Sequence, residues 1–248
     1  MRRSASGRKV RHAQSIDRAA AGQRAALRPL VASPSRRGCA LHGQAVAALL
    51  CAVAGFADAI GYLNLSVFAA NMTGNTVLLA IGLAQQQWAL SADRLLTLAC
   101  FFGGAMFGRV LLTLSRQHPS LPLLGEAALL GLALAVDAHQ AASIWLMAAA
   151  MGTQASAMTR FNGAAVSTVV VTSTMTRLAQ SGADLLVAPF GLKAGAASEP
   201  VGLLLGTWLS YALGAAAAAC LLPLMSQPLA VACAALLALS VWLWLKGR

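Results

Sequence analysis

Residues 68–84, FAANMTGNTVLLAIGLA, decide the fold together with GFADAIGYL at residues 55–63. Both segments lie inside hydrophobic sequence, yet polar side chains occur within them and in the link between them: Asp58, Asn64, Asn71, Thr73, Asn75 and Thr76. In hydrocarbon each unsatisfied polar group costs several kcal/mol, so these groups must face other helices or a wet cavity. Gly74 permits backbone shapes that other residues resist. The pattern predicts an interrupted transmembrane helix beside a helix that carries an acid.

The composition around these segments is that of a multi-span membrane protein. Of the 248 residues, 58% are hydrophobic and 10% are charged, whereas a soluble domain has about 45–50% and about 25%. The mean hydropathy is +0.71. The net charge of +11 is high, but ten of the 18 Lys and Arg residues fall in the first 37 positions. We therefore expect this charge to orient the chain in a membrane, and we expect no nucleic-acid partner.

The cysteines and histidines argue against a metal site. The five cysteines are scattered singly with no CxxC spacing, and no pair of the four histidines has metal-ligand spacing. An odd and dispersed set of cysteines is not typical of a disulfide framework or a zinc site. We predict no metal and no cofactor.

Residues 1–42 are predicted to be a basic, disordered cytoplasmic tail. They are rich in Arg, Ser and Ala and lack an apolar run, so they are not a secretory signal peptide. Such a tail is expected to touch anionic lipid. The alternative is that translation starts later in the sequence.

Eight hydrophobic segments are candidate spans, because the hydrocarbon core needs about 20 apolar residues per helix. They cover residues 43–65, 67–84, 95–114, 121–136, 143–158, 164–187, 201–222 and 229–245. The second is polar in its first half and about 27 Å long as a regular helix, so we expect a broken or re-entrant start. The prediction is an all-α membrane protein of about eight transmembrane helices. Six spans with two re-entrant polar segments is the alternative.

The two halves of the hydrophobic region, residues 43–140 and 141–248, are related by an internal repeat. Corresponding segments are GFAD at 55–58 and GTQA at 152–155, TGNTVLLA at 73–80 and TSTMTRLA at 172–179, and Gly104 with Gly108 against Gly214 with Ala218. The offsets are 97, 99 and 110 residues. Four spans in each half would make the halves parallel, related by an axis along the membrane normal.

Four of these motifs resemble the YoaK-type family of bacterial multi-pass membrane proteins, a domain of unknown function. They are GFADAIGYL, NMTGNT, MGTQASAMTRF and TSTMTRLAQ, and the resemblance covers about residues 44–245. In the second half, Ser173 and Ala155 stand where the family pattern has Gly and Asn. The resemblance implies an inner-membrane location and a multi-pass architecture, and it names no substrate.

The candidate substrate or ion pathway is built from the polar residues of both halves. Intramembrane acids such as Asp58 are rare and mark ion or proton sites, although a structural acid that pairs with an Arg or caps the neighbouring broken helix is the alternative. Broken helices supply backbone groups for ligands, whereas the alternative for their polar residues is hydrogen bonding between helices, worth about 0.6 kcal/mol on average. The candidate residues are Asp58, Asn71, Thr73, Asn75, Thr76, Gln154, Thr172, Ser173, Thr174 and Arg177, with Gly74, Gly104, Gly108 and Gly214 for helix packing.

Three expectations concern how the charged residues of the hydrophobic region are accommodated. Asp58 and Arg177 are predicted to pair, because an unpaired charge near the bilayer centre costs at least about 2.5–3.5 kcal/mol. Arg109 and Arg160 are expected to extend to the membrane surface. Three acids near predicted helix ends are expected to be solvated: Glu126, Asp137 and Asp184.

A small-solute or ion transporter of the inner membrane fits these features best, and a non-transporting scaffold or assembly factor is the alternative. An enzyme fits worst, because no nucleophile–base constellation, metal set or phosphate loop is visible. The positive-inside rule places both termini in the cytoplasm. Eight spans would leave Arg109, Arg116 and Arg160 outside or at the outer interface. The expected partners are the bilayer, an unidentified solute or ion and, as an open option, a second copy of the chain.

Overall fold

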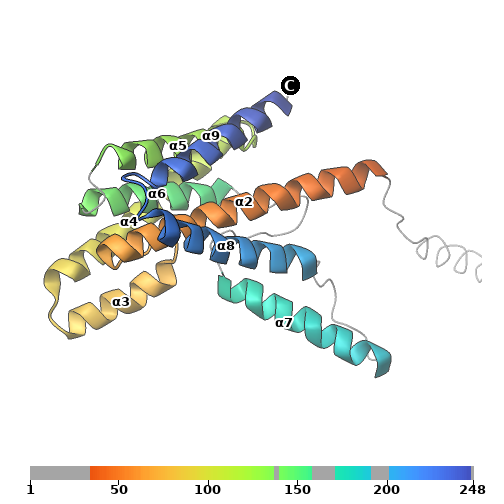
Figure 1. Ribbon diagram of the computed structural model, residues 1–248, viewed down its shortest axis with the longest axis horizontal. Coiled ribbons are helices and arrows are strands. Elements are labelled where there is room, and N and C mark those ends of the chain that lie inside the picture. The colour runs from red at the N-terminus through yellow and green to blue at the C-terminus, as the bar shows by residue number, and fades with distance from the viewer. Residues whose placement is uncertain (1–33, 137–139, 158–170, 191–200, 247–248) are drawn as a thin grey trace, which may run out of the picture. The chain divides into compact units, whose positions relative to one another are not determined.

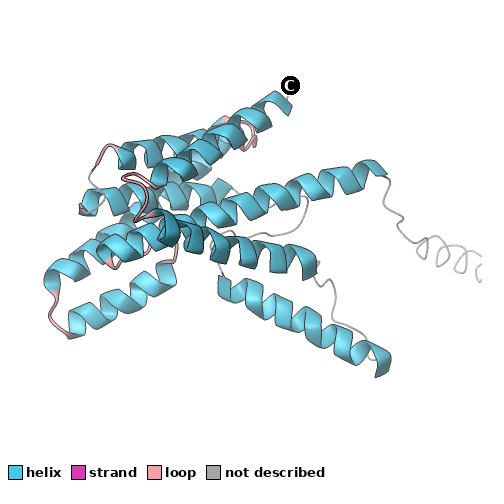
Figure 2. Ribbon diagram, in the orientation of Figure 1, coloured by secondary structure: helices cyan, strands magenta, loops and turns pink. Residues whose placement is uncertain are grey.

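The computed structural model describes residues 34–136, 140–157, 171–190 and 201–246. The chain divides into two units, Met1–Cys39 and Ala40–Arg248, and the second contains every contact discussed below. Within the described residues every regular element is helical and no strand occurs (Figure 2). The predicted all-α class is therefore confirmed.

The helices follow the order of the predicted segments (Figure 1). Their bounds are α2 Pro34–Leu65, α3 Met72–Ala84, α4 Trp88–Leu114, α5 Ser120–Leu134, α6 Ala141–Ala157, α7 Val171–Val187, the short 3₁₀ helix η1 Ala188–Phe190, α8 Val201–Leu221 and α9 Leu229–Lys246.

Four helices in the described part of the chain are long and apolar enough to cross a membrane: Gly43–Leu65 within α2, Trp88–Leu114, Val201–Leu221 and Leu229–Lys246. The first has the bounds that the sequence predicted. The 13 residues of α3 extend about 20 Å, which is less than the hydrocarbon thickness of about 30 Å. The helix also starts only at Met72, five residues after the predicted start near residue 67, which confirms the broken start of the second segment.

α4 begins earlier than expected, at Trp88 instead of near residue 95. The predicted span of residues 95–114 leaves Arg94 just outside it. In the structure Arg94 is 6% exposed, and its Nη1 atom donates to the carbonyl oxygen of Leu78 at 2.8 Å. A cation that reaches a carbonyl of the neighbouring helix can lie within the helical segment.

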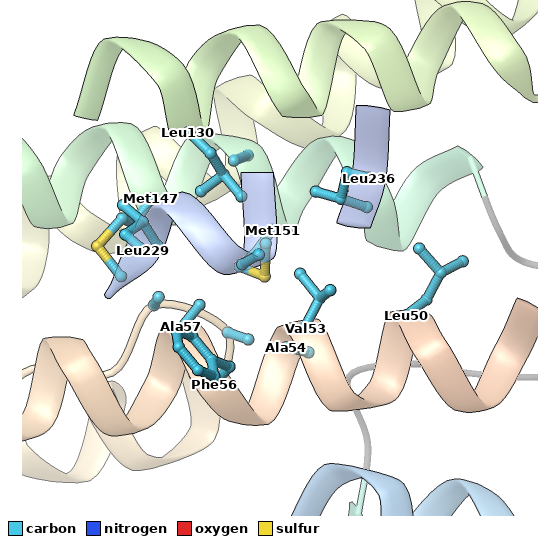
Figure 3. Packing of buried hydrophobic residues seen from close by; sticks show 14 of the residues in the cluster. Leu50, Val53, Ala54, Phe56, Ala57, Leu130, Met147, Met151, Leu229 and Leu236 are labelled. Carbon is cyan, nitrogen blue, oxygen red and sulfur yellow. The ribbon is translucent and has the colours of Figure 1, made fainter. Parts of the chain in front are cut away.

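α2 is the central helix of the second unit. In its most apolar window 67% of the residues are buried, against 22% in α4. Figure 3 shows Val53 and Ala57 of α2 turned toward Met147 and Met151 of α6, with Leu236 of α9 in the same cluster. The burial of α2 is therefore against other helices, and its acid, Asp58, faces protein with 3% exposure.

α2 and α6 run in opposite directions. Nε2 of Gln154 donates to the carbonyl oxygen of Leu50 at 3.1 Å, and Gly61 lies against the side chain of Ile144. Residue numbers thus rise along one helix as they fall along the other. Four crossings per half would make the two helices run the same way, so the predicted parallel arrangement of the halves is wrong.

The link from α2 to α3 explains this difference, because it folds back along α2. Ser66 ends α2 with φ of 54°, a left-handed conformation common just after helices. The N–H of Val67 then points to the carbonyl of Gly61 at 3.5 Å, and that of Ala70 donates to Asp58 at 2.5 Å. The chain has therefore returned by about two helical turns before α3 begins.

α3 then turns back toward the end of the membrane domain where α2 finished. Asn75, in its first turn, accepts a hydrogen bond from the N–H of Phe68 at 2.9 Å and donates to the Phe68 carbonyl at 2.7 Å. Asn75 of α3 therefore lies beside Phe68 of the link, so α3 runs back along the link in the opposite direction. For the first half this geometry favours the re-entrant alternative over a full crossing.

Candidate functional site

Asp58 holds the turning point of the re-entrant segment. Its side chain is 3% exposed. Oδ1 accepts hydrogen bonds from the N–H groups of Ala70 at 2.5 Å and Asn71 at 3.2 Å, and Oδ2 accepts one from the hydroxyl of Tyr211 on α8. The carboxyl group therefore joins α2, the link between α2 and α3, and α8.

The start of α3 is fixed by asparagines. Asn71 is the N-cap residue, and its Oδ1 accepts from the N–H of Gly74 at 3.1 Å, an arrangement that satisfies one of the free donors of the first turn. Gly74 lies within the helix, so the break that its flexibility was expected to provide falls before Met72. Gly74 instead leaves room for the ring of Phe68, from which an added Cβ would lie only 3.0 Å away.

Two glycines bring α8 against α2 near Asp58. A Cβ added at Gly55 would collide with the carbonyl oxygen of Tyr211, and one added at Gly214 would collide with that of Ala52. Helix backbones approach this closely only where side chains are small. The close approach places the Tyr211 hydroxyl on Asp58.

The contact between α4 and α6 has the same geometry. A Cβ at Gly152 would collide with the carbonyl oxygen of Phe101, and one at Gly104 would collide with that of Ala149. Gly108 continues this face one turn later, against the backbone of Thr153.

The residues of the two contacts correspond at the offsets read from the sequence. The pairs are Ala52 and Ala149, Gly55 and Gly152, and Asp58 and Ala155, each 97 apart, with Phe101 and Tyr211, and Gly104 and Gly214, each 110 apart. The sequence motifs that set the offsets do not include Ala52 and Ala149 or Phe101 and Tyr211. These two pairs follow from the helix contacts, which are thus an independent support for the offsets.

A cavity of about 680 Å³ lies beside the start of α3. Its walls come from the end of α2, the re-entrant segment, and single residues of α4, α6, α7 and α8. The lining residues are Tyr62, Phe68, Ala70, Asn71, Met72, Thr73, Gly74, Val77, Leu78, Phe101, Ala155, Thr172 and Tyr211. This volume lies within the range of small-molecule sites.

The structure brings some of the expected pathway residues to this cavity and uses others elsewhere. Asn71, Thr73 and Thr172 line it, and Asp58 lies directly behind Tyr211 and the link. The remaining residues do not line it: Asn75 holds Phe68, Thr76 donates to the Met72 carbonyl, Gln154 joins α6 to α2, and Ser173, Thr174 and Arg177 make contacts of their own.

The predicted ion pair between Asp58 and Arg177 stays a prediction. The hydrogen bonds described for Asp58 come from neutral groups, two backbone amides and a tyrosine hydroxyl. The carboxyl group is therefore held without needing a cation, which weakens the reason for which the pair was expected.

Four aromatic residues of the cavity were missed in the sequence analysis: Tyr62, Phe68, Phe101 and Tyr211. One signal was available for Tyr211, because the hydroxyl of a buried tyrosine needs a hydrogen-bond partner and the apolar span around it offers none. The phenylalanines gave no signal, since they resemble ordinary lipid-facing or core residues.

Glu126 corrects another expectation. It was expected to be solvated near a helix end, but it is 0% exposed, and neither carboxyl oxygen has a hydrogen-bond partner among the described residues. α5 begins at Ser120 and packs on α6 and α9, which encloses its second turn. Arg109 is exposed and Asp184 is partly buried, while Asp137 and Arg160 lie outside the described residues.

Within the described ranges no group of three or more His, Cys, Asp or Glu side chains could hold a metal ion. The polar groups that the structure places at the site are one acid, hydroxyl and amide groups, beside aromatic rings.

Comparisons with known proteins agree with the helical membrane architecture. A family model described as "Protein of unknown function (DUF1275)" matches residues 46–242. The UPF0700 transmembrane protein YoaK of Bacillus subtilis (strain 168) is 33% identical over 150 residues, which cover 56% of this chain and 67% of that protein. No solved structure matches the chain. The resemblance inferred from GFADAIGYL and NMTGNT is confirmed, and the chain is a membrane protein of the DUF1275 family.

Proposed function

We propose that this protein transports a small solute across the bacterial inner membrane, and that the cavity beside α3 is its solute site. The observation that carries the proposal is this cavity of about 680 Å³, bounded by a re-entrant helix whose turning point is held by a buried acid. Secondary transporters commonly bind their substrates where broken helices meet between repeats.

The matched helix contacts support an inverted repeat. If α2 corresponds to α6 and α4 to α8, the opposite directions of α2 and α6 require a pseudo-two-fold axis in the membrane plane. The cavity then lies at the interface of the repeats, because equivalent residues line it: Phe101 with Tyr211 and Thr73 with Thr172. An inverted repeat around one cavity is the arrangement by which transporters expose a site alternately to the two sides.

The topology that follows has three crossings per half and one re-entrant segment in each. Six crossings return the C-terminus to the side of the basic tail, which the positive-inside rule places in the cytoplasm. Arg116, after α4, and Lys246, at the end of α9, then lie on that same side. The eight-span alternative leaves Arg116 outside, so the distribution of positive charge favours six crossings.

Site-directed labelling tests the proposal directly. In a variant whose five cysteines are replaced by serine or alanine, Thr73→Cys is placed in the cavity and treated with a charged, membrane-impermeant thiol reagent. Transport predicts labelling both in intact cells and in inverted vesicles, since the cavity opens in turn to each side. Val110→Cys, on α4 and 54% exposed toward lipid, is the control that stays unlabelled.

The scaffold alternative gives the opposite result. A static protein has no reason to open one cavity to both sides, so Thr73→Cys would react from one side only or from neither. That outcome would overturn the transport proposal.

A further inference from the structure

We propose that the solute is a monovalent organic cation, a quaternary ammonium or a protonated amine, held against aromatic rings with Asp58 as its countercharge. This inference rests on the proposed solute site and names the chemical class that the site takes. It is carried by the lining of the cavity and by the position of the acid.

Aromatic side chains are concentrated at this cavity. Aromatic residues are 6% of the chain, which has two tyrosines and seven phenylalanines, yet four of the thirteen lining residues are aromatic, including both tyrosines. The rings of Tyr62 and Phe68 stack with centroids 4.8 Å apart and planes 15° apart. Phe101 and Tyr211 add rings from α4 and α8. Aromatic rings gathered around one volume can bind an ammonium group through cation–π attraction.

The acid is connected to the same walls. The ring of Tyr211 lines the cavity while its hydroxyl donates to Asp58, and Ala70 and Asn71, which line the cavity, donate to the other carboxyl oxygen. The carboxyl group therefore lies one layer behind the surface that a ligand would touch. The donors that hold it are neutral, so a cationic ligand would supply an opposite charge at this wall.

An anion is disfavoured by the same contacts. A helix N-terminus ordinarily offers its free N–H groups to anions, but at α3 the N–H of Asn71 binds Asp58 and that of Gly74 binds the Asn71 side chain. Arg94 reaches α3 further along, at the Leu78 carbonyl, and does not line the cavity. Among the described residues that line the cavity, none has a cationic side chain.

A highly polar neutral solute such as a sugar is disfavoured too. It would need many hydrogen-bonding partners, and the polar side chains among the described lining residues are Asn71, Thr73, Thr172 and Tyr211. The Asn71 oxygen caps α3 and the Tyr211 hydroxyl binds Asp58. Two threonines remain, which suits a ligand with an apolar body and one charge.

The test uses three probes of one shape and different charge: benzyltrimethylammonium, its neutral isostere neopentylbenzene, and the anion benzylsulfonate. Each is titrated into the full-length protein in lipid nanodiscs by calorimetry, with empty nanodiscs as the blank. The cation is expected to bind at least about tenfold more tightly than the neutral isostere, and the anion is expected not to bind.

Matched variants assign the binding to this cavity. Phe101→Leu should weaken cation binding about tenfold, whereas Phe102→Leu, the same change at the adjacent residue that is 68% exposed and outside the cavity, should leave it unchanged. Asp58→Asn should remove the preference for the cation over the neutral probe. Because Asp58→Asn also loosens the re-entrant segment, the Phe101 and Phe102 pair, which leaves Asp58 intact, decides the result if that variant fails to fold.

The outcomes separate this inference from the proposed function. If the cation and the neutral isostere bind equally and Phe101→Leu weakens both, the proposal of a cationic solute is overturned. The solute site itself is then supported. Binding of the anion, or cation binding unaffected by Phe101→Leu, would also overturn the proposal of a cationic solute. The labelling of Thr73→Cys from both membrane sides is independent of all three probes and judges transport separately.

Discussion

The α2–α8 contact and the α4–α6 contact have the same backbone geometry and different chemistry. In each, two glycines let a helix reach a backbone carbonyl of its partner. Beside the first lie Asp58 and Tyr211, joined by a hydrogen bond; at the corresponding positions beside the second lie Ala155 and Phe101. The glycines give both contacts the same close crossing, whereas the side chain one turn after Gly55 and Gly152 differs between them, Asp58 in one and Ala155 in the other. The comparison locates the chemistry in one contact only.

Transplanting the acid should have the largest effect. Ala155→Asp places a carboxyl group beside Phe101, which has no hydroxyl to donate, and should destabilise the protein by about 2.5–3.5 kcal/mol, the insertion-scale value for a central acid. Adding Phe101→Tyr should recover about 0.5–1.5 kcal/mol by restoring the hydrogen bond. Unfolding midpoints in detergent measure both. If the second change recovers nothing, the two contacts are not equivalent at this position.

Filling the glycine contacts should have the next largest effect. Gly104→Ala and Gly214→Ala each bring a methyl group onto a backbone carbonyl that cannot rotate away, and each should cost about 1–3 kcal/mol as overpacking. Gly103→Ala is the matched control, because a Cβ there meets nothing within 4 Å. Thermal unfolding of the three variants side by side measures the difference. Equal stability of Gly103→Ala and Gly104→Ala would contradict the close crossing.

Exchanging the hydroxyl group should have the smallest effect. Tyr211→Phe removes one hydrogen bond to Asp58, which keeps its two backbone donors, and should cost about 0.5–1.5 kcal/mol. Phe101→Tyr adds a hydroxyl on the side that holds no acid and should change stability by less. Chemical denaturation of the two single variants compares them. A larger loss for Phe101→Tyr would reverse the assignment of the polar contact to α2 and α8.

The bounds of the helical segments were easier to predict from the sequence than the direction in which the chain runs through them. The bounds of the Gly43–Leu65 span follow from hydropathy alone, and the polar residues after Phe68 indicated a break, because both are properties of local sequence. The direction of the chain through the break is not local. Residues 67–84 are long enough to suggest a crossing, and contacts with α2 such as the bond from the Ala70 amide to Asp58 reveal that the chain folds back.

The site was partly predictable for the same reason. Asp58, Asn71 and Thr73 are conspicuous in an apolar segment, so the sequence analysis found them. Tyr211 and Phe101 are not, since their importance depends on which helices meet. Glu126 was misjudged because its exposure depends on where α5 begins and on the helices that cover it, neither of which is encoded in its immediate neighbours.

The re-entrant path of residues 66–84 is the claim on which the inverted halves and the cavity depend, and the membrane side of its two ends tests it most directly. Ser66→Cys and Gln86→Cys, both exposed, are each introduced into the cysteine-free chain and labelled with an impermeant thiol reagent in intact cells and in inverted vesicles. We expect both positions to react from the same side, the one opposite the basic tail. Labelling of Ser66→Cys and Gln86→Cys from opposite sides would show that the segment crosses the membrane and would contradict the account.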